Sequence, residues 1–599
     1  MSTPDGREPH IVLASMPWAL YNRPSIQLGA LKAYLESETG CKVTTLHPFL
    51  EIAGAVGTST YAVLADNGWA GEALFAALLF PGQKQQAHNT FRNCLGVKAR
   101  QLPEFDELLT TLESSCTAWL NRTEWQTLLL AGFSLCFNQL LASLYIAARL
   151  REQPDSPPVV FGGSSCSGAL GRSLLGHFPQ IDYVVDGEGE VPLAGLCGYL
   201  SGATPLFPDR VLARERPARL TASPEIADLN SLPPPDYSSY FRELQTFFPD
   251  SPFLPVLPME FSRGCWWNKC TFCNLNLQWC GYRWKNSAKV LAELRHLTAS
   301  HQCLDYSFTD NALPPGEAGH FFASTAITGA DLRFFAEIRG VANAKTLAEY
   351  RKGGLDTIQV GIESLSSTLL RKMEKGVTVI DNIAMLKYAA AADIRLEGNL
   401  IVDFPGTTPA EIAETLENLD YVLPYTPLSA ASFFLGYGSA VARDPDAYGI
   451  SAITSHHRYR RLFPAGLLKN LLLLISDYRG DRQLQRTLWR PVRERITRWQ
   501  DFHRQQRSGP CCPLSYRDGG DFLIIRQELP SFPTLRHKLK GWSRAIYLFC
   551  NEIRTVSEIT RQFPHLKESA ILAFIHQLSQ KRLMYREEHR ILSLAIHQK

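Results

Sequence analysis

Three cysteines form the strongest chemical signal in the sequence. Cys265, Cys270 and Cys273 are spaced C-x4-C-x2-C and directly follow the apolar run MEFS, which begins at residue 259. Such short spacings let the backbone wrap around one metal centre, so that three thiolates can ligate it together. An odd number of cysteines argues against a disulfide, and zinc normally takes a fourth cysteine or histidine, for which Cys280 is the nearest candidate. Three ligands therefore favour a [4Fe–4S] cluster with one open iron, and zinc is the alternative.

The residues around these cysteines alternate between short apolar runs and helical patterns. Runs typical of strands begin at residues 259, 304, 332, 357, 395 and 431, and helical stretches such as SAKVLAELRHLTAS lie between them. Six β/α units in one stretch predict a barrel or partial barrel over residues 258–450. In such barrels the loops after the strands carry the chemistry, and the cysteines follow the first strand.

The rest of the chain divides into four further segments. Residues 1–205 alternate in the same way and predict an α/β fold with an open, Rossmann-like sheet. Residues 206–257 are rich in proline and predict an extended linker with little helix. Residues 451–514 predict a helical connector. Residues 515–599, with one strand, helices and a terminal hairpin, resemble a small winged-helix module.

Composition limits the partners of the chain. With 61 basic and 58 acidic residues the net charge is +3, which gives no general reason to expect nucleic acid or an anionic membrane surface as a partner. The apolar stretch 128–150 is long enough to span a bilayer, but Asn138 and Gln139 at its middle favour a buried strand–helix unit. The first residues lack the pattern of a signal peptide, so we expect a cytoplasmic protein with reduced thiols.

Several motifs together resemble one enzyme family. They are SRGCWW (262–267) around the first cysteine, MPWALYNRPSIQLGALKAYL (16–35), VVDGEGE (184–190), VGIESLSSTLLRKMEKGVT (360–378) and DFPGTT (403–408). The sequence resembles radical S-adenosylmethionine (SAM) enzymes that have an N-terminal cobalamin-binding domain and act in the maturation of ribosomally made peptides. Many members are C-methyltransferases, and the tryptophan 2-C-methyltransferase of thiopeptide biosynthesis is related to them. The resemblance runs from about residue 11 to residue 440.

The resemblance implies three cofactors: a [4Fe–4S] cluster on the three cysteines, SAM and cobalamin. The carboxylate of Glu337 and the guanidinium of Arg339 would bind the ammonium and carboxylate groups of SAM, although an ion pair on the barrel rim is the alternative. The full set of predicted SAM contacts is Phe272, Glu337, Arg339, Gly361, Glu363 and Ser364. No residue is assigned a catalytic role.

The predicted cobalamin contacts depend on weaker signals. They are Gly162, Gly163, Arg23 and Ser25. The two glycines equally fit a strand-to-helix turn that needs positive φ, and Ser25 equally fits a helix cap. The Asp-x-His-x-x-Gly ligand motif is absent and His10 and His47 lack its context, so we expect a cobalt without a protein imidazole. Glu188 and Glu190 lie beside glycines, which is typical of solvated loop carboxylates.

By resemblance, the expected reaction is methyl transfer from SAM via methylcobalamin to a carbon of a ribosomal peptide. Methylation of a free aromatic amino acid, at C-2 of tryptophan, and a non-methylating radical SAM cyclisation are the alternatives. The enzyme would need an electron donor of flavodoxin or ferredoxin type as a partner. Residues 515–599 would recognise the leader segment of the peptide by adding a strand to their sheet, and structural support and nucleic-acid binding are the alternatives.

Overall fold

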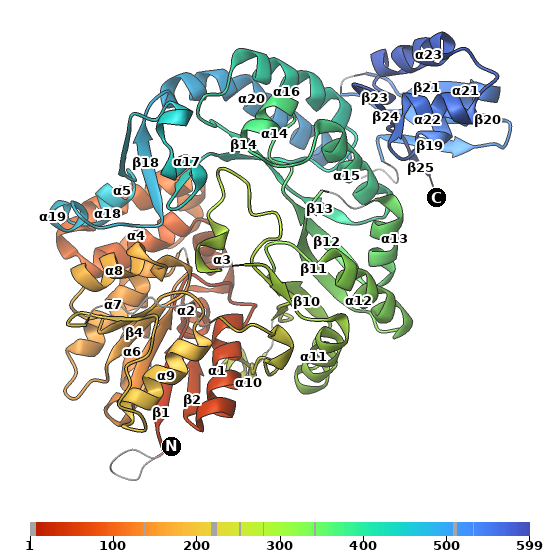
Figure 1. The fold of residues 1–599 in the computed structure, drawn as a ribbon. Helices are drawn as coiled ribbons and strands as arrows, with labels where there is room; N and C mark the ends of the chain where they lie inside the picture. The colour runs from red at the N-terminus through yellow and green to blue at the C-terminus, as the bar shows by residue number, and fades with distance from the viewer. Residues whose placement is uncertain are drawn as a thin grey trace.

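The chain folds into three parts, an N-terminal sheet, a central half-barrel and a small C-terminal module (Figure 1). The computed structural model describes residues 8–136, 138–216, 225–250, 253–279, 281–340, 343–506, 512–530 and 532–598. Cys280 lies outside these ranges. No helix among the described residues is both long and apolar enough to cross a membrane.

The N-terminal sheet has the strand order β2-β1-β3-β4-β5-β6, with only β6 antiparallel. This is the doubly wound order in which ligands bind beyond the carboxyl ends of the strands, where the strand order reverses. The stretch 128–150, considered above as a membrane span, instead supplies one strand and one helix of this part. The strands are β1 (His10–Ala14), β2 (Lys42–Leu46), β3 (Leu130–Ser134), β4 (Val159–Gly162), β5 (Tyr183–Val185) and β6 (Val211–Ala213).

Helices cover both faces of this sheet because its strands are apolar on both sides. Ile11 and Leu13 of β1 pack towards one set of helices, whereas Val12 and Ala14 pack into a separate core on the other face. The first face is covered by α1 (Ile26–Thr39) and α9 (Glu190–Leu200), and the second by α2 (Pro48–Val56), α4 (Gly68–Leu79), α6 (Phe105–Arg122), α7 (Leu140–Arg151) and α8 (Ala169–His177). The predicted α/β sheet is therefore present.

The half-barrel is a parallel sheet in the order β13-β12-β11-β10-β7, continued by the parallel pair β14–β15. Helices lie on its outer side, seen in green in Figure 1. Its strands are β7 (Leu257–Met259), β10 (Asp305–Phe308), β11 (Arg333–Ile338), β12 (Leu355–Val360), β13 (Arg395–Glu397), β14 (Asn399–Val402) and β15 (Ser429–Ser432). Its helices are α11 (Ser287–His301), α12 (Pro315–Ile327), α13 (Ala344–Lys352), α14 (Ser367–Lys372), α15 (Val379–Ala391) and α16 (Pro409–Val422).

Two segments differ from the expectation. Within the proline-rich residues 206–257, the structure forms β6 and the ten-residue helix α10 (Ser238–Phe247), because Tyr237 and Tyr240 are fully buried and anchor the segment. The predicted helical connector also contains strands, since β17 (Ala452–Ser455) and β18 (Ile475–Arg479) join β16 (Leu435–Gly436) in a small antiparallel sheet. The long helix α20 (Arg482–Gln506) follows this sheet.

The C-terminal module comprises residues 514–598. One antiparallel hairpin stack, β19 (Leu514–Asp518), β20 (Phe522–Gln527) and β21 (Leu535–Lys540), is followed by helices and a second small sheet. The later elements run in the order α21 (Gly541–Phe549), β22 (Arg554–Thr555), α22 (Val556–Gln562), α23 (Glu568–Gln580), β23 (Met584–Glu587), β24 (Arg590–Ser593) and β25 (Ile596–His597). Lys387 of α15 joins the module to the half-barrel by donating to the carbonyl oxygens of Asn551 and Ser593.

Candidate active site

The cysteine loop begins at β8 (Ser262–Arg263) and returns at β9 (Arg283–Trp284), which pairs antiparallel with β8. Gly264 opens the loop with a φ of +82°, and a Cβ atom there would lie 2.4 Å from the carbonyl oxygen of Gly281. Only glycine therefore fits this close approach. The loop is also tied to the end of α14, because the Thr271 N–H donates to the carbonyl oxygen of Met373 at 3.1 Å.

The three loop cysteines are half-buried free thiols. Burial raises the pKa of Cys270 and raises the pKa of Cys273 to about 11, while the cationic side chain of Lys375 opposes both shifts. Thiols in such surroundings become stable thiolates only beside a strong positive charge, as a bound metal centre provides. The donor set thus fits a metal cluster. Because Cys280 is not among the described residues, the structure does not test it as a fourth ligand.

Four of the six predicted SAM contacts lie at the ends of β11 and β12, and a fifth, Phe272, lies beside them on the cysteine loop. Lys375 links them, since its Nζ lies 3.2 Å from Glu363 Oε1 and 6.0 Å from the centre of the Phe272 ring. A Cβ atom on Gly361 would lie 2.3 Å from the same Nζ, so glycine leaves room for the lysine. Lys375 was not predicted, although it lies within the quoted motif 360–378. Ser364 differs, because it is buried and its hydroxyl accepts the N–H of Ser366 within a turn.

Glu337 and Arg339 lie at this edge without pairing with each other. Burial, together with the nearby negative charge of Glu363, raises the pKa of Glu337 to about 7. Arg339 stacks over Trp266 and Trp267, with its guanidinium carbon 5.0 and 4.5 Å from the two ring centres. Glu337 and Arg339 therefore form no ion pair at the barrel rim. Among the described residues, no cationic side chain lies within 4.0 Å of the Glu337 carboxyl group.

A buried ion network holds the start of the cysteine loop, and the sequence did not indicate it. Arg263 is only 5% exposed and its guanidinium lies 2.9 Å from Glu188, 2.7 Å from Glu190 and 2.8 Å from Glu260. Glu188 also pairs with Arg283 of β9. The expectation of solvated carboxylates at Glu188 and Glu190 is thus wrong, because both are buried in ion pairs with Arg263. These ion pairs connect the N-terminal sheet to the loop.

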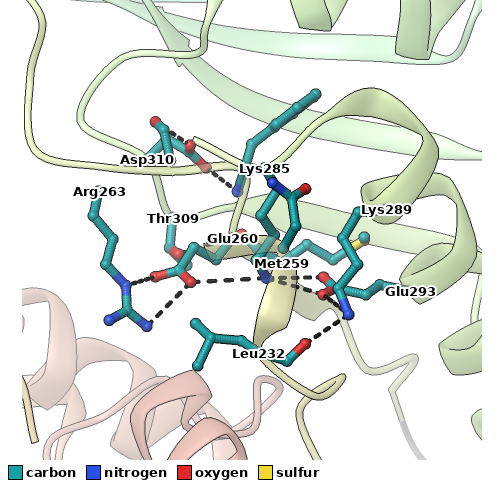
Figure 2. Close-up of polar contacts among 12 residues, drawn as sticks. Leu232, Met259, Glu260, Arg263, Lys285, Lys289, Glu293, Thr309 and Asp310 are labelled. Carbon is teal, nitrogen blue, oxygen red and sulfur yellow. Dashed lines mark hydrogen bonds and ion pairs between the residues drawn. The ribbon is translucent and has the colours of Figure 1, made fainter. Parts of the chain in front are cut away.

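The network continues behind the loop into the half-barrel (Figure 2). Lys285 lies 3.8 Å from Glu260 and 3.0 Å from Glu293, and Lys289 lies 3.5 Å from Glu293. Asp310, at the end of β10, accepts from the N–H of Phe261, and burial raises the pKa of Asp310 to about 7. These contacts fix the end of β7 and therefore the direction in which the cysteine loop leaves the barrel.

A cavity of about 1220 Å³ lies between the two larger parts. It is larger than the roughly 300–1,000 Å³ of a site for a drug-sized ligand. One side is formed by the carboxyl ends of the N-terminal strands, including Gly132 and Ser134. The other side is formed by the cysteine loop, from Gly264 and from residues 274–279, together with α20 and the residues before it.

The predicted cobalamin contacts divide in relation to this cavity. Gly162 and Gly163 line it. Gly163 has a φ of +99° and a Cβ atom there would lie 2.5 Å from the carbonyl oxygen of Leu135, so the turn itself requires this glycine. Arg23 does not line the cavity but donates to Ser307 of β10 at 3.2 Å, and Ser25 caps α1.

Histidines reach the cavity from an unexpected part of the chain. His10 contacts Thr44 and His47 contacts Glu243, and neither lines the cavity. His456 and His457, which follow β17, do line it. Sequence reasoning considered only the N-terminal histidines, and no sequence motif marks the other two.

Comparison with known proteins agrees with this geometry. Residues 259–419 match the model of the radical SAM superfamily. An uncharacterized methyltransferase of Pyrococcus horikoshii is 29% identical over 40% of this chain and 52% of its own length, and a hopanoid C-3 methylase of Methylococcus capsulatus is 26% identical over 40% and 46%. The chain thus spans about half the length of the curated relatives it matches.

Solved structures show the same fold over a larger part of the chain. The radical SAM methyltransferase TsrM of Kitasatospora setae superposes with a TM-score of 0.55 at 16% identity, covering 82% of this chain and 89% of its own. The cobalamin-dependent SAM radical enzyme OxsB superposes with a TM-score of 0.50 at 17% identity, covering 74% and 56%. Residues 259–419 therefore match the radical SAM superfamily, and the chain as a whole has a fold similar to those of TsrM and OxsB.

Proposed function

We propose that this chain is a cobalamin-dependent radical SAM methyltransferase that transfers a methyl group to a carbon atom. The observation that carries the proposal is the cavity shared by the strand ends of the N-terminal sheet and the cysteine loop. A corrinoid held on the sheet side would face a cluster held on the loop side. The methyltransferase and methylase names of two relatives support the reaction class. The cobalamin and [4Fe–4S] cluster bound in a solved TsrM structure support the cofactors.

The cluster and SAM each have a set of residues that fits them. Cys265, Cys270 and Cys273 would hold the cluster, leaving one iron for SAM. Glu337 offers a partly buried carboxyl group for the ammonium of SAM, and Arg339 offers a guanidinium for its carboxylate. When bound, the cluster supplies the electron that cleaves SAM, and the corrinoid supplies a cobalt centre for methyl transfer.

The protein itself positions the reacting groups and excludes water. Trp266 and Trp267 cover Arg339 beside the cysteines, and Trp267 is fixed by donating to the carbonyl oxygen of Glu374 at 2.8 Å. Arg263 fixes the loop against the N-terminal sheet. Groups held in this way react as if at very high concentration, because their orientation has already been set.

The corrinoid part of the proposal is testable with one cavity-filling variant. Gly162 lines the cavity, lacks a positive φ, and leaves space for a Cβ atom, which would lie 3.6 Å from Val185. Gly162→Leu should therefore fold but reduce the hydroxocobalamin that remains bound after gel filtration, while the cluster absorption stays. Gly176→Leu on α8, where nothing lies within 4 Å, is the matched control. Equal retention of corrinoid in both variants would place the corrinoid elsewhere.

We propose further that the substrate is a ribosomal peptide and that the C-terminal module binds its leader segment. β21 lies at the edge of its sheet, and Arg536, Lys538 and Lys540 on it are exposed. An edge strand can accept a peptide strand through main-chain hydrogen bonds, and the basic side chains favour an acidic leader. The element order from α21 to β24 supports a winged helix behind this edge.

Labelling separates this substrate class from the alternative. Trideuteromethyl-SAM is supplied to the reconstituted enzyme with a ribosomal precursor peptide that has an acidic leader and, separately, with free tryptophan. Mass spectrometry should find label in the peptide and none in tryptophan. Label in free tryptophan alone would overturn the peptide proposal and leave the methyltransferase proposal in place.

A further inference from the structure

Four arginines between residues 458 and 493 line one part of the cavity wall. Arg458, Arg482, Arg486 and Arg493 all line the cavity, and we call these four residues the arginine wall. Three of them belong to α20 at spacings of four and seven residues, so they share one face of that helix. In Figure 1, α20 lies beside α16, and it also contacts β15, whereas α18 (Tyr459–Leu462) contacts α4 of the N-terminal part.

The arginine wall carries more positive charge than its neighbours neutralise. Arg493 pairs with Asp403, and Arg482 lies 2.8 Å from Asp477. Within the described ranges, no carboxylate lies within 4.0 Å of Arg458 or of Arg486. Arg486 is exposed and Arg458 is half-buried over the ring of Trp69. Neither guanidinium is held by a carboxylate of the described residues, so both can meet an anion that enters the cavity.

The neighbouring histidines do not change this balance. Ligand atoms of His456, His457 and Asp477 lie within 4.8 Å of one another, a spacing that a metal ion could use. However, Asp477 already accepts from Arg482 and from the N–H of His457, and a cation there would be repelled by the arginines. Burial lowers the pKa of His456 to about 4, so its ring is neutral at pH 7. The wall therefore attracts an anion.

We propose that Arg458 and Arg486 form a carboxylate-binding subsite for the substrate, on either side of Arg482. Arg482 lies between them. On one side it pairs with Asp477, which also contacts His457, the residue before Arg458; on the other side it stacks over Tyr478, which lies near Arg486. Arginine suits this role because its planar fork can bind both oxygens of a carboxylate. Phe434, which is 51% exposed and also lines the cavity, offers an apolar surface for the rest of the ligand.

The subsite narrows the substrate class of the proposed methyl transfer and depends on that proposal. The methylated compound would carry a carboxylate close to an apolar or aromatic group. The carboxylate is either the α-carboxylate of a free amino acid or an acidic side chain of a peptide, and both share the same chemistry. Because the arginine wall belongs to the segment from residue 458 to α20, whereas Gly162 and Gly163 belong to the N-terminal sheet, we assign the anion to the substrate and not to the corrinoid.

Binding of two isosteric probes tests the subsite in the full chain. Indole-3-acetate and indole-3-acetamide have nearly the same shape and differ in charge, and their affinities are measured by isothermal titration before and after loading with hydroxocobalamin. The acetate should bind about tenfold more tightly or more, as expected for hydrogen bonds to a charged group. Arg486→Met and Arg458→Met should each reduce this preference. Arg490→Met, on the same helix but paired with Glu494 outside the cavity, should not.

Three outcomes would overturn the subsite. They are equal affinity for both probes, a loss of the preference for the acetate in Arg490→Met as large as in Arg486→Met or Arg458→Met, and complete displacement of indole-3-acetate by hydroxocobalamin. Normal corrinoid retention with no preference for the acetate would remove the subsite alone, whereas absent corrinoid retention would remove the proposed function. Titrating tryptophan against tryptophanamide, and an Ac-Trp-Glu-NH2 peptide against Ac-Trp-Gln-NH2, then distinguishes the two sources of the carboxylate.

Discussion

Replacing Arg263 with methionine should destabilise the chain more than any surface substitution. Arg263 contacts the buried carboxylates of Glu188 and Glu190 and the partly buried carboxylate of Glu260. After its removal, Glu188 keeps Arg283 and Glu260 keeps Lys285 at 3.8 Å, but Glu190 has no remaining cation within 4.0 Å among the described residues. Leaving one buried charge unpaired costs about 3–5 kcal/mol. For a cooperative unit of 150–250 residues this corresponds to a fall in Tm of at least about 6 °C.

The dependence of this loss on pH identifies its cause. A buried carboxylate that has lost its counter-charge destabilises the fold only while it is ionised, so the loss of stability in the variant should shrink as the pH falls. In the wild type, burial alone would raise the pKa of Glu260, but Arg263 and Lys285 outweigh it and hold that pKa below its usual range. The Tm difference measured by calorimetry should therefore be larger at pH 8 than at pH 5.5.

A matched control makes the result decisive. Arg395 pairs with Glu397 on the surface, with its side chain 69% exposed, so Arg395→Met should change stability by less than about 1 kcal/mol. Arg263→Lys keeps one charge and should recover part of the loss. If Arg263→Met melted like the Arg395 control at pH 8, the network would not carry the interface and the reasoning would be refuted.

Three further predictions concern separate parts of the chain. Replacing the three loop cysteines with alanine should abolish the broad visible absorption of the cluster and SAM cleavage, whereas Cys94→Ala should change neither; iron content and turnover measure this. Glu72→Gln should raise stability by about 2–4 kcal/mol at pH 8 and less at pH 5, as seen in thermal unfolding, because burial raises the pKa of Glu72 to about 8 and the protonated form is favoured only in the folded chain. Arg536→Glu combined with Lys538→Glu should raise KM for the precursor peptide without altering substrate-free SAM cleavage, and the exposed Arg561→Glu on α22 is the control; an equal rise in both would argue against leader binding at β21.

Strand positions could be predicted from the sequence because each buried parallel strand is a short continuous apolar run. IVLA of β1 and VVFG of β4 are apolar on both faces, so they are visible without any knowledge of their neighbours. The proline-rich segment shows the limit of this reasoning. Prolines and loops dominate its composition, yet Tyr237 and Tyr240 bury their rings, and the Tyr237 hydroxyl donates to the carbonyl oxygen of Pro258 in the half-barrel.

Partners distant in the chain could not be predicted in the same way. Glu188 and Arg263 are 75 residues apart, and their pairing depends on how two separate sheets meet. Glutamates beside glycines favour a solvated loop when considered locally, because burying a lone carboxylate is costly. Similarly, arginines along α20 are typical of a solvated helix face until the fold brings that face to a cavity.

The position of this network explains why ions rather than apolar side chains join the two parts. Apolar side chains would stabilise the interface equally well or better, but they would allow the N-terminal sheet and the cysteine loop to shift relative to each other. Arg263 instead directs separate nitrogen atoms at Glu188, Glu190 and Glu260, so that only one placement of the loop satisfies all three. Cys265, the first of the three loop cysteines, lies only two residues after Arg263, and a displacement of about 1 Å between reacting groups can reduce a rate about a hundredfold. The proposed methyl transfer needs groups held by two different sheets to meet, and directional hydrogen bonds at the first turn of the loop supply that alignment.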